Sequence, residues 1–297
     1  MKSNQMGEAQ RFFLTSVSLI TSDGPYGQNV MAAEWTMQIS YRPMLIAVFI
    51  HEGSATLYNI KMKKKFAINL ASEDQSALVS VAGGYSRREV DKLRLTGLFN
   101  TRTGRFGLPL IRDCVVAAEC KLFSIEKFGD HTMVVGKVLS IEYNPEKKPL
   151  IYHQRRYFKV GRKIEPRRKE VKVGKKIFDV FNSGNKEFVA KYAGFRVISK
   201  GMVLVSQNDT HATNCFIPYV RTTKHHDNKK ELESHLKRLQ LKIQLYDEPE
   251  IKRLMLKYNG RCLRTNFILF GGKLGDTPKN YQWKPFARDA FLKSLIK

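Results

Sequence analysis

Short runs of apolar residues, separated by turn-forming residues, recur through the first half of the chain. The alternation or the length of these runs predicts β-strands over residues 13–21, 29–35, 44–50, 66–70, 115–125 and 133–141. Turn signals such as Ser22–Gly27 and Gly129–Asp130 separate them. Many strands with few helices favour a β-barrel over a doubly wound parallel sheet.

Three short helices are expected among these strands. Ser54 opens a helical stretch that runs to about Lys61. Ser72–Gln75 and Ser86–Glu89 both fit the capping box, in which Ser and the Glu or Gln three residues later satisfy free N–H groups reciprocally. The last of these helices is predicted to end near Gly97.

The pattern changes after Lys163. Residues 196–206 predict a hairpin that turns at Lys200–Gly201. Two sets of apolar residues follow helical spacing, Leu232/Leu236/Leu239/Ile243 and Ile251/Leu254/Met255/Tyr258, the second ending before Gly260 as a C-cap. The chain is therefore expected to contain two domains, 1–163 and a mixed α/β region over 164–297.

The charge is strongly basic. The 297 residues hold 52 Lys+Arg against 27 Asp+Glu, a net charge of +25. The densest basic run lies between Arg155 and Lys176. Its positive charge would attract polyanions such as nucleic acid, but the same composition is also found on ordinary solvated, Lys-rich protein surfaces. No nucleic-acid module surrounds the run, so the solvated surface is favoured and nucleic acid is kept as the less favoured partner.

The sequence carries few signals of membrane insertion, secretion, disulfide formation or metal binding. The longest apolar run, Met44–Ile50, is far shorter than the ~20 residues of a membrane helix, and residues 1–8 carry no secretory signal. We expect a cytoplasmic protein with no membrane partner. Cys114 and Cys120 are expected to be buried thiols. A zinc set of Cys215 with His211, His225 and His226 lacks paired ligand spacing, so no metal site is predicted.

Several residues suit a phosphate group. Ser54 and Thr56 stand at a helix start, where free N–H groups and a partial positive charge favour anions. Arg87 and Arg88 supply guanidinium groups beside Ser86, and Lys92 follows one turn later. The alternative is that the hydroxyls are only caps and that the cations form a surface helix with acidic neighbours. Neither GxGxxG nor GxxxxGK[ST] occurs in the sequence.

An ordered set of motifs resembles the flavin reductase-like, FMN-binding split-barrel family over roughly residues 10–160. These motifs are Thr-Ser-Asp-Gly at 21–24, Asn-Val-Met-Ala-Ala-Glu-Trp at 29–35, Ser-Ala-Thr-Leu-Tyr-Asn-Ile at 54–60, Ser-Arg-Arg-Glu-Val-Asp-Lys-Leu at 86–93 and Gly-Asp-His at 129–131. Arg87 stands where the family often has Gly, and Leu93 replaces the usual Phe. Neither departure removes a phosphate ligand. Residues beyond Lys163 are outside the resemblance.

The resemblance implies a mainly β fold with α elements, an FMN-binding split β-barrel followed by a mixed α/β C-terminal extension. It implies a homodimer that binds FMN, with NADH or NADPH as the hydride donor. The flavin would lie against Asn29, Met31, Ala32, Glu34, Trp35 and Thr36, with its phosphate at Ser54, Thr56, Ser86, Arg87, Arg88 and Lys92. Trp35 either lies against the flavin ring or belongs to the hydrophobic core of the barrel. His131 either contacts the nicotinamide or reduced flavin, or is a turn residue.

The expected function is that of an FMN-dependent oxidoreductase of the flavin reductase type. Hydride would pass from NAD(P)H through bound FMN to a flavin, a ferric complex or a protein acceptor. The alternative is a non-catalytic FMN-binding protein whose basic C-terminal region docks a partner or nucleic acid.

Overall fold

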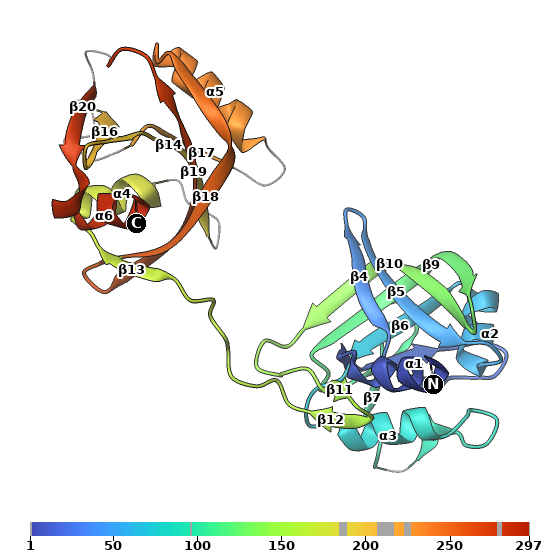
Figure 1. Ribbon diagram of the computed structural model, residues 1–297. Helices are drawn as coiled ribbons and strands as arrows, with labels where there is room; N and C mark the ends of the chain where they lie inside the picture. The colour runs from blue at the N-terminus through green and yellow to red at the C-terminus, as the bar shows by residue number, and fades with distance from the viewer. Residues whose placement is uncertain are drawn as a thin grey trace. The chain divides into compact units, whose positions relative to one another are not determined.

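The chain is mainly β with some helices, and it divides into two compact units (Figure 1). The computed structural model describes residues 2–95, 97–183, 189–206, 217–222, 227–277 and 281–296. The units are Met1–Lys163 and Ile164–Lys297, and each has hydrophobic clusters built only from its own buried residues.

A seven-stranded antiparallel sheet forms the centre of the N-terminal unit. Its spatial order is β3 (Asn29–Ala33), β2 (Ser18–Ser22), β6 (Lys65–Leu70), β9 (Val116–Phe128), β10 (His131–Tyr143), β5 (Met44–His51) and β4 (Thr36–Tyr41). Every predicted strand of this unit is present. Strand β4 was not predicted, although Met37, Ile39 and Tyr41 alternate with polar residues along it.

Smaller elements surround this sheet. They are the helices α1 (Lys2–Ala9), η1 (Gln10–Phe12), α2 (Ala55–Lys63), α3 (Ser76–Gly84) and η2 (Lys92–Arg94), the pair β7 (Thr101–Thr103) and β8 (Pro109–Ile111), and the three-stranded sheet of β1 (Thr15–Ser16), β11 (Ile151–His153) and β12 (Arg156–Phe158). In this last sheet, the C-terminal segment of the unit (β11 and β12) pairs with its N-terminal segment (β1).

The large sheet is buried on both of its faces at β2. Ile20 of β2 belongs to the cluster that includes Leu57 and Ile60 of α2. Its neighbour Leu19 belongs to the cluster that includes Val79 of α3. Because successive side chains of a strand point to opposite faces, β2 lies between two cores, and α2 and α3 are held on opposite sides of the strand.

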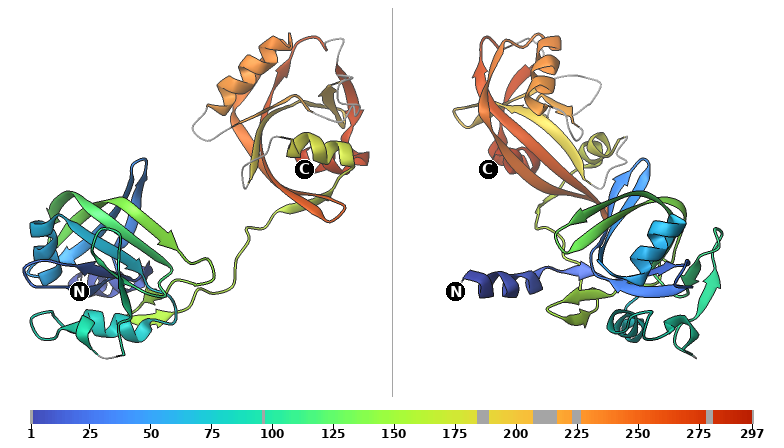
Figure 2. Two further views of the ribbon diagram at one scale, coloured as in Figure 1. Left: turned by 180° about the vertical axis from the view of Figure 1, so that it is seen from behind. Right: turned by 90° about the vertical axis from the view of Figure 1, so that its right-hand side faces the viewer.

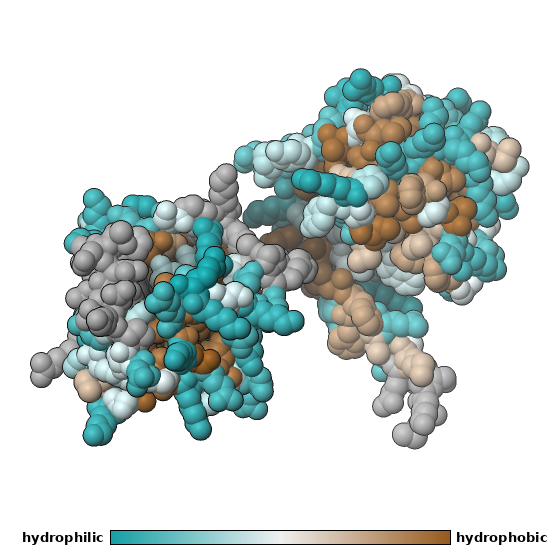
Figure 3. Space-filling view, turned by 90° about the horizontal axis from the view of Figure 1, so that it is seen from above, coloured by the Kyte–Doolittle hydropathy of each residue, from teal (hydrophilic) through white to brown (hydrophobic). Residues whose placement is uncertain are grey.

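Apolar side chains also lie on the surface of the N-terminal unit, where they form much of the face visible in Figure 3 (right-hand unit). They come from β4, β9 and β10, at alternate positions along each strand: Met37, Ile39, Phe123, Ile125, Leu139 and Ile141. No helix among the described residues is long and apolar enough to cross a membrane.

Only half of each predicted capping box forms, because the Ser86 hydroxyl accepts from Arg88 and the buried Ser72 hydroxyl has no hydrogen-bond partner, and the helices do not follow as predicted. The N–H of Ser86 donates to Glu89 at 2.7 Å, yet residues 87–89 form a turn and only the short η2 follows. The N–H of Ser72 donates to Gln75 at 3.0 Å, and α3 begins only at Ser76. The capping box is a local signal, and tertiary contacts of the residues that follow decide whether a helix continues.

The C-terminal unit is built on a five-stranded mixed sheet, best seen from behind in Figure 2. Its order is β13 (Lys169–Lys172), β18 (Ile243–Tyr258), β19 (Arg261–Leu274), β14 (Ala190–Arg196) and β17 (Tyr219–Arg221). The other elements are the sheet β15 (Ile198–Ser199), β16 (Met202–Ser206) and β20 (Tyr281–Pro285), and the helices α4 (Lys175–Asn182), α5 (Asn228–Arg238), η3 (Phe286–Arg288) and α6 (Ala290–Ile296).

One helix prediction in this unit is wrong. Residues 251–258 lie in strand β18, where Leu254 and Leu256 alternate with exposed or half-buried neighbours. Asn259 and Gly260 take positive φ values of 42° and 74°, which is hairpin-turn geometry and not a helix end. The predicted hairpin at Lys200–Gly201 is confirmed, and so is a helix that carries Leu232 and Leu236, although it ends before Leu239 and Ile243.

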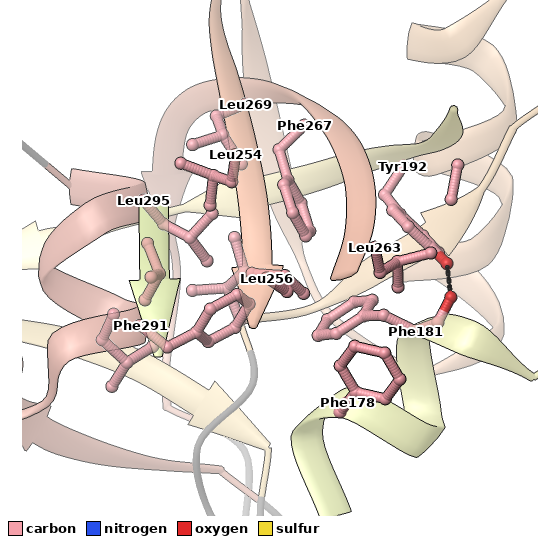
Figure 4. Close-up of a cluster of buried hydrophobic side chains, with 14 of the residues drawn as sticks. Phe178, Phe181, Tyr192, Leu254, Leu256, Leu263, Phe267, Leu269, Phe291 and Leu295 are labelled. Carbon is pink, nitrogen blue, oxygen red and sulfur yellow. Dashed lines mark hydrogen bonds between the residues drawn. The ribbon is translucent and has the colours of Figure 1, made fainter. Parts of the chain in front are cut away.

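The main core of the C-terminal unit is rich in aromatic rings (Figure 4). Phe181 of α4 contacts Tyr192 and Phe267 at centroid distances of 4.9 and 5.3 Å. The hydroxyl of Tyr192 donates to the carbonyl oxygen of Phe181 at 2.6 Å, so this buried polar atom has a partner. The unit therefore has a well-packed interior of its own.

Candidate functional site

A cavity of about 400 Å³ lies against the C-terminal end of β3. Its walls come from β3 and the residues after it, from α3, from the paired strands β5 and β10, and from the returning segment β11–β12. The lining includes Met31, Ala32, Glu34, Trp35, Phe49, His51, Ser80, Gly83, His131, Tyr152 and Tyr157. The mixture of aromatic, hydroxyl and imidazole groups suits a planar heteroaromatic ligand.

Two histidines and a tryptophan form one wall of this cavity. The His131 ring lies 4.7 Å from Trp35 and 5.6 Å from His51, which is its direct partner across β5 and β10. Nδ1 of His131 is 2.8 Å from a carboxylate oxygen of Asp130, and this hydrogen bond lowers the pKa of Asp130. The ionised carboxylate orients the His131 ring and leaves Nε2 as the nitrogen for a ligand.

The opposite end of β3 is polar. Nδ2 of Asn29 donates to Oγ1 of Thr56 at 2.8 Å, and both residues are buried. Ser54 is the N-cap of α2, makes no capping hydrogen bond and contacts the sulfur of Met31 at 3.6 Å. The start of α2 therefore lies against β3, and the helix covers the stretch that the sequence predicted. The Ser54 hydroxyl caps no N–H group of this helix.

Arg87 and Arg88 reach the turn that precedes β3. Arg87 donates to the carbonyl oxygen of Gln28 at 3.3 Å and pairs with Asp91 at 2.9 Å. Arg88 donates to the hydroxyl of Tyr26 at 3.2 Å. Both guanidinium groups thus lie near the end of β3 at which Asn29 and Thr56 are found.

Asn59 of α2 fixes the same turn from the other side. Its buried amide donates to Oγ of Ser22 at 3.2 Å and to the carbonyl oxygen of Gly27 at 2.9 Å, and it accepts from the N–H of Tyr26 at 3.0 Å. Gly24 must lack a side chain here, since a Cβ atom would lie 2.7 Å from Oδ1 of Asn59. Sequence reasoning did not identify Asn59 as the residue that positions this turn.

Lys92 is placed differently from Arg87 and Arg88. It is almost fully buried, and its Nζ donates to the carbonyl oxygen of Tyr85 at 2.5 Å. Burial, followed by the charge of Arg87, lowers the pKa of Lys92. In this structure Lys92 fixes the turn that carries both arginines. Ser86 also acts within that turn, because its hydroxyl accepts from the N–H of Arg88 at 3.0 Å.

The two ends of β3 are compatible with a flavin mononucleotide. The strand has five residues, which span about 16 Å at ~3.3 Å per residue. A ligand that carries a ring at one end and a phosphate at the other could lie along it, with the ring in the cavity beside Trp35. Its phosphate would lie near Ser54, Arg87 and Arg88, and the buried Oδ1 of Asn29, which has no protein partner, faces the same end of the strand.

Two further cavities adjoin the first and share Glu34 and Trp35 with it. One, of about 680 Å³, is lined mainly by apolar side chains: Phe13, Leu14, Trp35, Met37, Phe49 and Phe128. The other, of about 210 Å³, includes Arg11, Gln154 and Arg155. Thr36, which was predicted to contact the flavin, lines only the apolar one of these three cavities.

The structure groups most of the predicted residues but also adds others. Met31, Ala32, Glu34, Trp35 and His131 meet in the first cavity, whereas the predicted phosphate residues do not line it. His51, Tyr152, Tyr157, Arg11 and Arg155 were missed. Only His51 had a signal in the sequence, because it directly follows a predicted strand that pairs with the one beginning at His131.

The thiol predictions are confirmed for the cysteines that the structure describes. Cys114 and Cys120 are buried, and burial raises the pKa of each to about 12. The residues of the rejected zinc set, Cys215, His211, His225 and His226, lie outside the described residues. Within the described ranges no group of three or more His, Cys, Asp or Glu side chains is arranged to hold a metal ion.

Comparison with known proteins gives a consistent result for the N-terminal unit. Residues 10–161 match the family described as "Flavin reductase like domain". An FMN reductase (NADH) RutF 1 from Methylorubrum extorquens (strain PA1) is 27% identical over 150 residues, which is 50% of this chain and 72% of that protein. A flavin reductase from Pseudomonas putida is 28% identical over 144 residues, 48% of this chain and 81% of that protein.

Among solved structures, the NADH:FAD oxidoreductase SgcE6 of Streptomyces globisporus C-1027 matches with a TM-score of 0.50 and 20% identity. The match covers 54% of this chain and 94% of that one. At this identity the likeness concerns the fold alone.

Proposed function

The chain belongs to the flavin reductase like family, and on that premise we propose that it is an FMN-dependent oxidoreductase that uses NADH or NADPH. The observation that carries the proposal is the placement of β3 between a cluster of hydroxyl and guanidinium groups and an aromatic cavity. Bound flavin would accept hydride from the nicotinamide and transfer electrons to a second acceptor.

The chain's own residues would bind and orient this flavin. Arg87 and Arg88 would form charge-assisted hydrogen bonds with the phosphate, joined by Ser54 at the start of α2. Thr56 and Lys92 would position these groups without contacting the phosphate themselves, because their polar atoms already form hydrogen bonds with Asn29 and Tyr85. Main-chain groups from Met31 to Trp35 would contact the edge of the ring system.

The nicotinamide nucleotide would enter from the cavity that holds Arg11 and Arg155. A pyrophosphate requires cations, and these two come from segments joined by a hydrogen bond from the N–H of Gln154 to the carbonyl oxygen of Arg11, 3.0 Å long. Because that cavity shares Trp35 and Tyr152 with the flavin cavity, the nicotinamide could reach His131.

We also propose that the protein is a homodimer. The outward apolar residues of β4, β9 and β10, such as Ile39, Phe123 and Ile141, form a surface that a second copy would cover. Replacing Phe123 by Lys is expected to yield monomers in light scattering, whereas Met62→Lys, an exposed apolar position on α2, is expected to leave the mass unchanged.

The second candidate function is FMN binding without turnover, coupled to docking of a polyanion on the C-terminal unit. It is favoured by the neighbouring cations Arg168, Arg253 and Arg264, of which Arg264 is paired with both carboxylate oxygens of Glu165. Burial, then the charges of the other two arginines, lowers the pKa of Arg168. A filter-binding assay with duplex DNA across a salt series tests this function, since a contact driven by phosphates weakens steeply as salt rises.

A spectroscopic experiment distinguishes the two functions. The full chain is loaded with FMN, and NADH or NADPH is added without oxygen. Loss of the visible flavin absorbance within the time of mixing supports the oxidoreductase. A spectrum that persists with both donors supports the binding protein, and a chain that takes up no flavin contradicts both.

A further inference from the structure

We propose that the electron acceptor is an uncharged planar molecule of the quinone class, bound in the apolar cavity between β4 and the segment before β1. This inference rests on the proposed function and specifies its second substrate. The cavity measures about 680 Å³, and its lining includes Phe13, Leu14, Met37 and Phe128. A volume of this size, with mainly apolar walls and few polar groups, is typical of small-molecule sites.

The cavity adjoins the place where the flavin ring is proposed to lie. Both cavities are bordered by Trp35, Phe49 and His131. The ring of Phe49 lies 6.3 Å from Trp35 and 6.5 Å from Phe128, so aromatic surface continues from one cavity into the other. A planar acceptor could therefore stack in the second cavity with its edge directed toward the first.

The charges in the cavity select against anionic acceptors. Its charged groups are the carboxylates of Glu34 and Asp130, and none of the described lining residues is a lysine or an arginine. Asp130 stays ionised at neutral pH, because its hydrogen bond with His131 lowers its pKa. Ferric citrate and phosphorylated flavins carry negative charge and would find no cation on this lining, whereas a neutral quinone needs none.

The reaction balances with the donor already proposed. Reduction of a quinone to the hydroquinone takes two electrons and two protons. NAD(P)H supplies the two electrons and one proton as hydride and becomes NAD(P)⁺, and the second proton comes from solvent. The quinone is the oxidant, and no other reactant is required.

Binding can be measured without turnover, because the chain has only two tryptophans, Trp35 and Trp283. In the full-length Trp283→Phe variant, Trp35 is the remaining reporter. Without added flavin, menadione is expected to quench its fluorescence saturably, after correction with free N-acetyltryptophanamide. Ferric citrate is expected to quench it no more than it quenches the free indole.

A charge substitution tests the site itself. Leu14 is 64% exposed and lines only the apolar cavity and not the flavin cavity. Leu14→Lys is expected to weaken menadione binding about tenfold, since the apolar contact is lost and a charge is added. The matched control Met62→Lys adds the same charge to an exposed apolar position on α2 and is expected to bind like the parent protein.

Steady-state rates with NAD(P)H and saturating FMN complete the test. Menadione is expected to give a higher kcat/KM than ferric citrate, and Leu14→Lys is expected to reduce that preference. Failure of menadione to quench Trp35, or equal quenching of the two lysine variants, would overturn the inference. A chain that binds menadione but no flavin would instead contradict the proposed function, so the two failures are distinguishable.

Discussion

His51 and His131 are direct partners on the neighbouring strands β5 and β10, and their rings lie 5.6 Å apart at an angle of 89°. Nδ1 of His51 lies 2.7 Å from the carbonyl oxygen of Glu52, which can only accept, so this nitrogen carries the proton. Nδ1 of His131 is held by Asp130. Each ring thus has its Nε2 atom left for a ligand in the cavity beside Trp35.

The first prediction concerns these histidines. His131→Ala is expected to lower kcat for NAD(P)H oxidation by about a hundredfold, the lower end of the range for loss of a positioned proton-transfer group. His51→Ala is expected to have a smaller effect. The pKa of Asp130 is lowered, so its carboxylate is ionised above about pH 4 and orients His131 across the neutral range. Equal rates in His131→Ala and the parent protein would make His131 a turn residue.

The second prediction tests the phosphate end of β3. Replacing Arg87 and Arg88 together by Ala is expected to weaken FMN binding by a few kcal/mol, at ~1.5–3 kcal/mol per charged hydrogen bond. Isothermal titration calorimetry with FMN measures the loss of affinity. Arg94→Ala is the control, because Arg94 lies on the same segment with its side chain 88% exposed. Unchanged affinity in the double variant would place the phosphate elsewhere.

The third prediction concerns the donor. Arg155→Gln is expected to raise KM for NAD(P)H several-fold while kcat changes little. A contact with the pyrophosphate stabilises the bound ground state and the transition state equally, so its loss weakens donor binding without changing the rate of the chemical step. Arg156→Gln is the matched control, because this neighbour does not line the arginine cavity. Equal KM values in the two variants would exclude Arg155 from the donor site.

The fourth prediction follows from the buried thiols. With a pKa of about 12, on the order of one in ten thousand Cys114 or Cys120 side chains is a thiolate at pH 8. Iodoacetamide is therefore expected to modify the exposed Cys262 and to spare both buried thiols, as read by peptide mass spectrometry. Rapid labelling of Cys120 in the native protein would contradict the buried core.

The same pKa shifts give a stability prediction with a defined sign. Between the ordinary value of 9.0 and about 12, the unfolded chain releases thiol protons that the folded chain retains. The unfolded state then binds fewer protons, so the free energy of unfolding falls as pH rises through this range. Urea titrations from pH 8 to 11 measure it, with Cys120→Ala expected to reduce the dependence.

The fifth prediction concerns the two units. Because the buried clusters of the N-terminal unit contain no residue beyond Lys163, the fragment 1–163 is expected to fold and to bind FMN. Circular dichroism and flavin titration check the two properties. A folded fragment that lost FMN binding would move part of the cofactor site into residues 164–297.

The sequence by itself determined the elements whose signals are local. Alternation of apolar residues predicted the long strands of the central sheet, and Ser54 predicted the start of α2. The motifs around Asn29, Ser54 and His131 were sufficient to identify the family of the N-terminal unit. Strand β4 was missed although its apolar residues alternate, and residues 251–258 were assigned to a helix because a few apolar residues satisfy helical and strand spacing alike.

Only the tertiary structure decided which residues surround the site. Tyr152 and Arg155 reach the neighbourhood of Trp35 because β11 pairs with β1, more than a hundred positions earlier in the chain. His51 meets His131 through strand register, and Lys92 is buried by its bond to Tyr85. The β1–β11 and β5–β10 pairings join chain segments over long sequence separations, and no local pattern of side chains records that information.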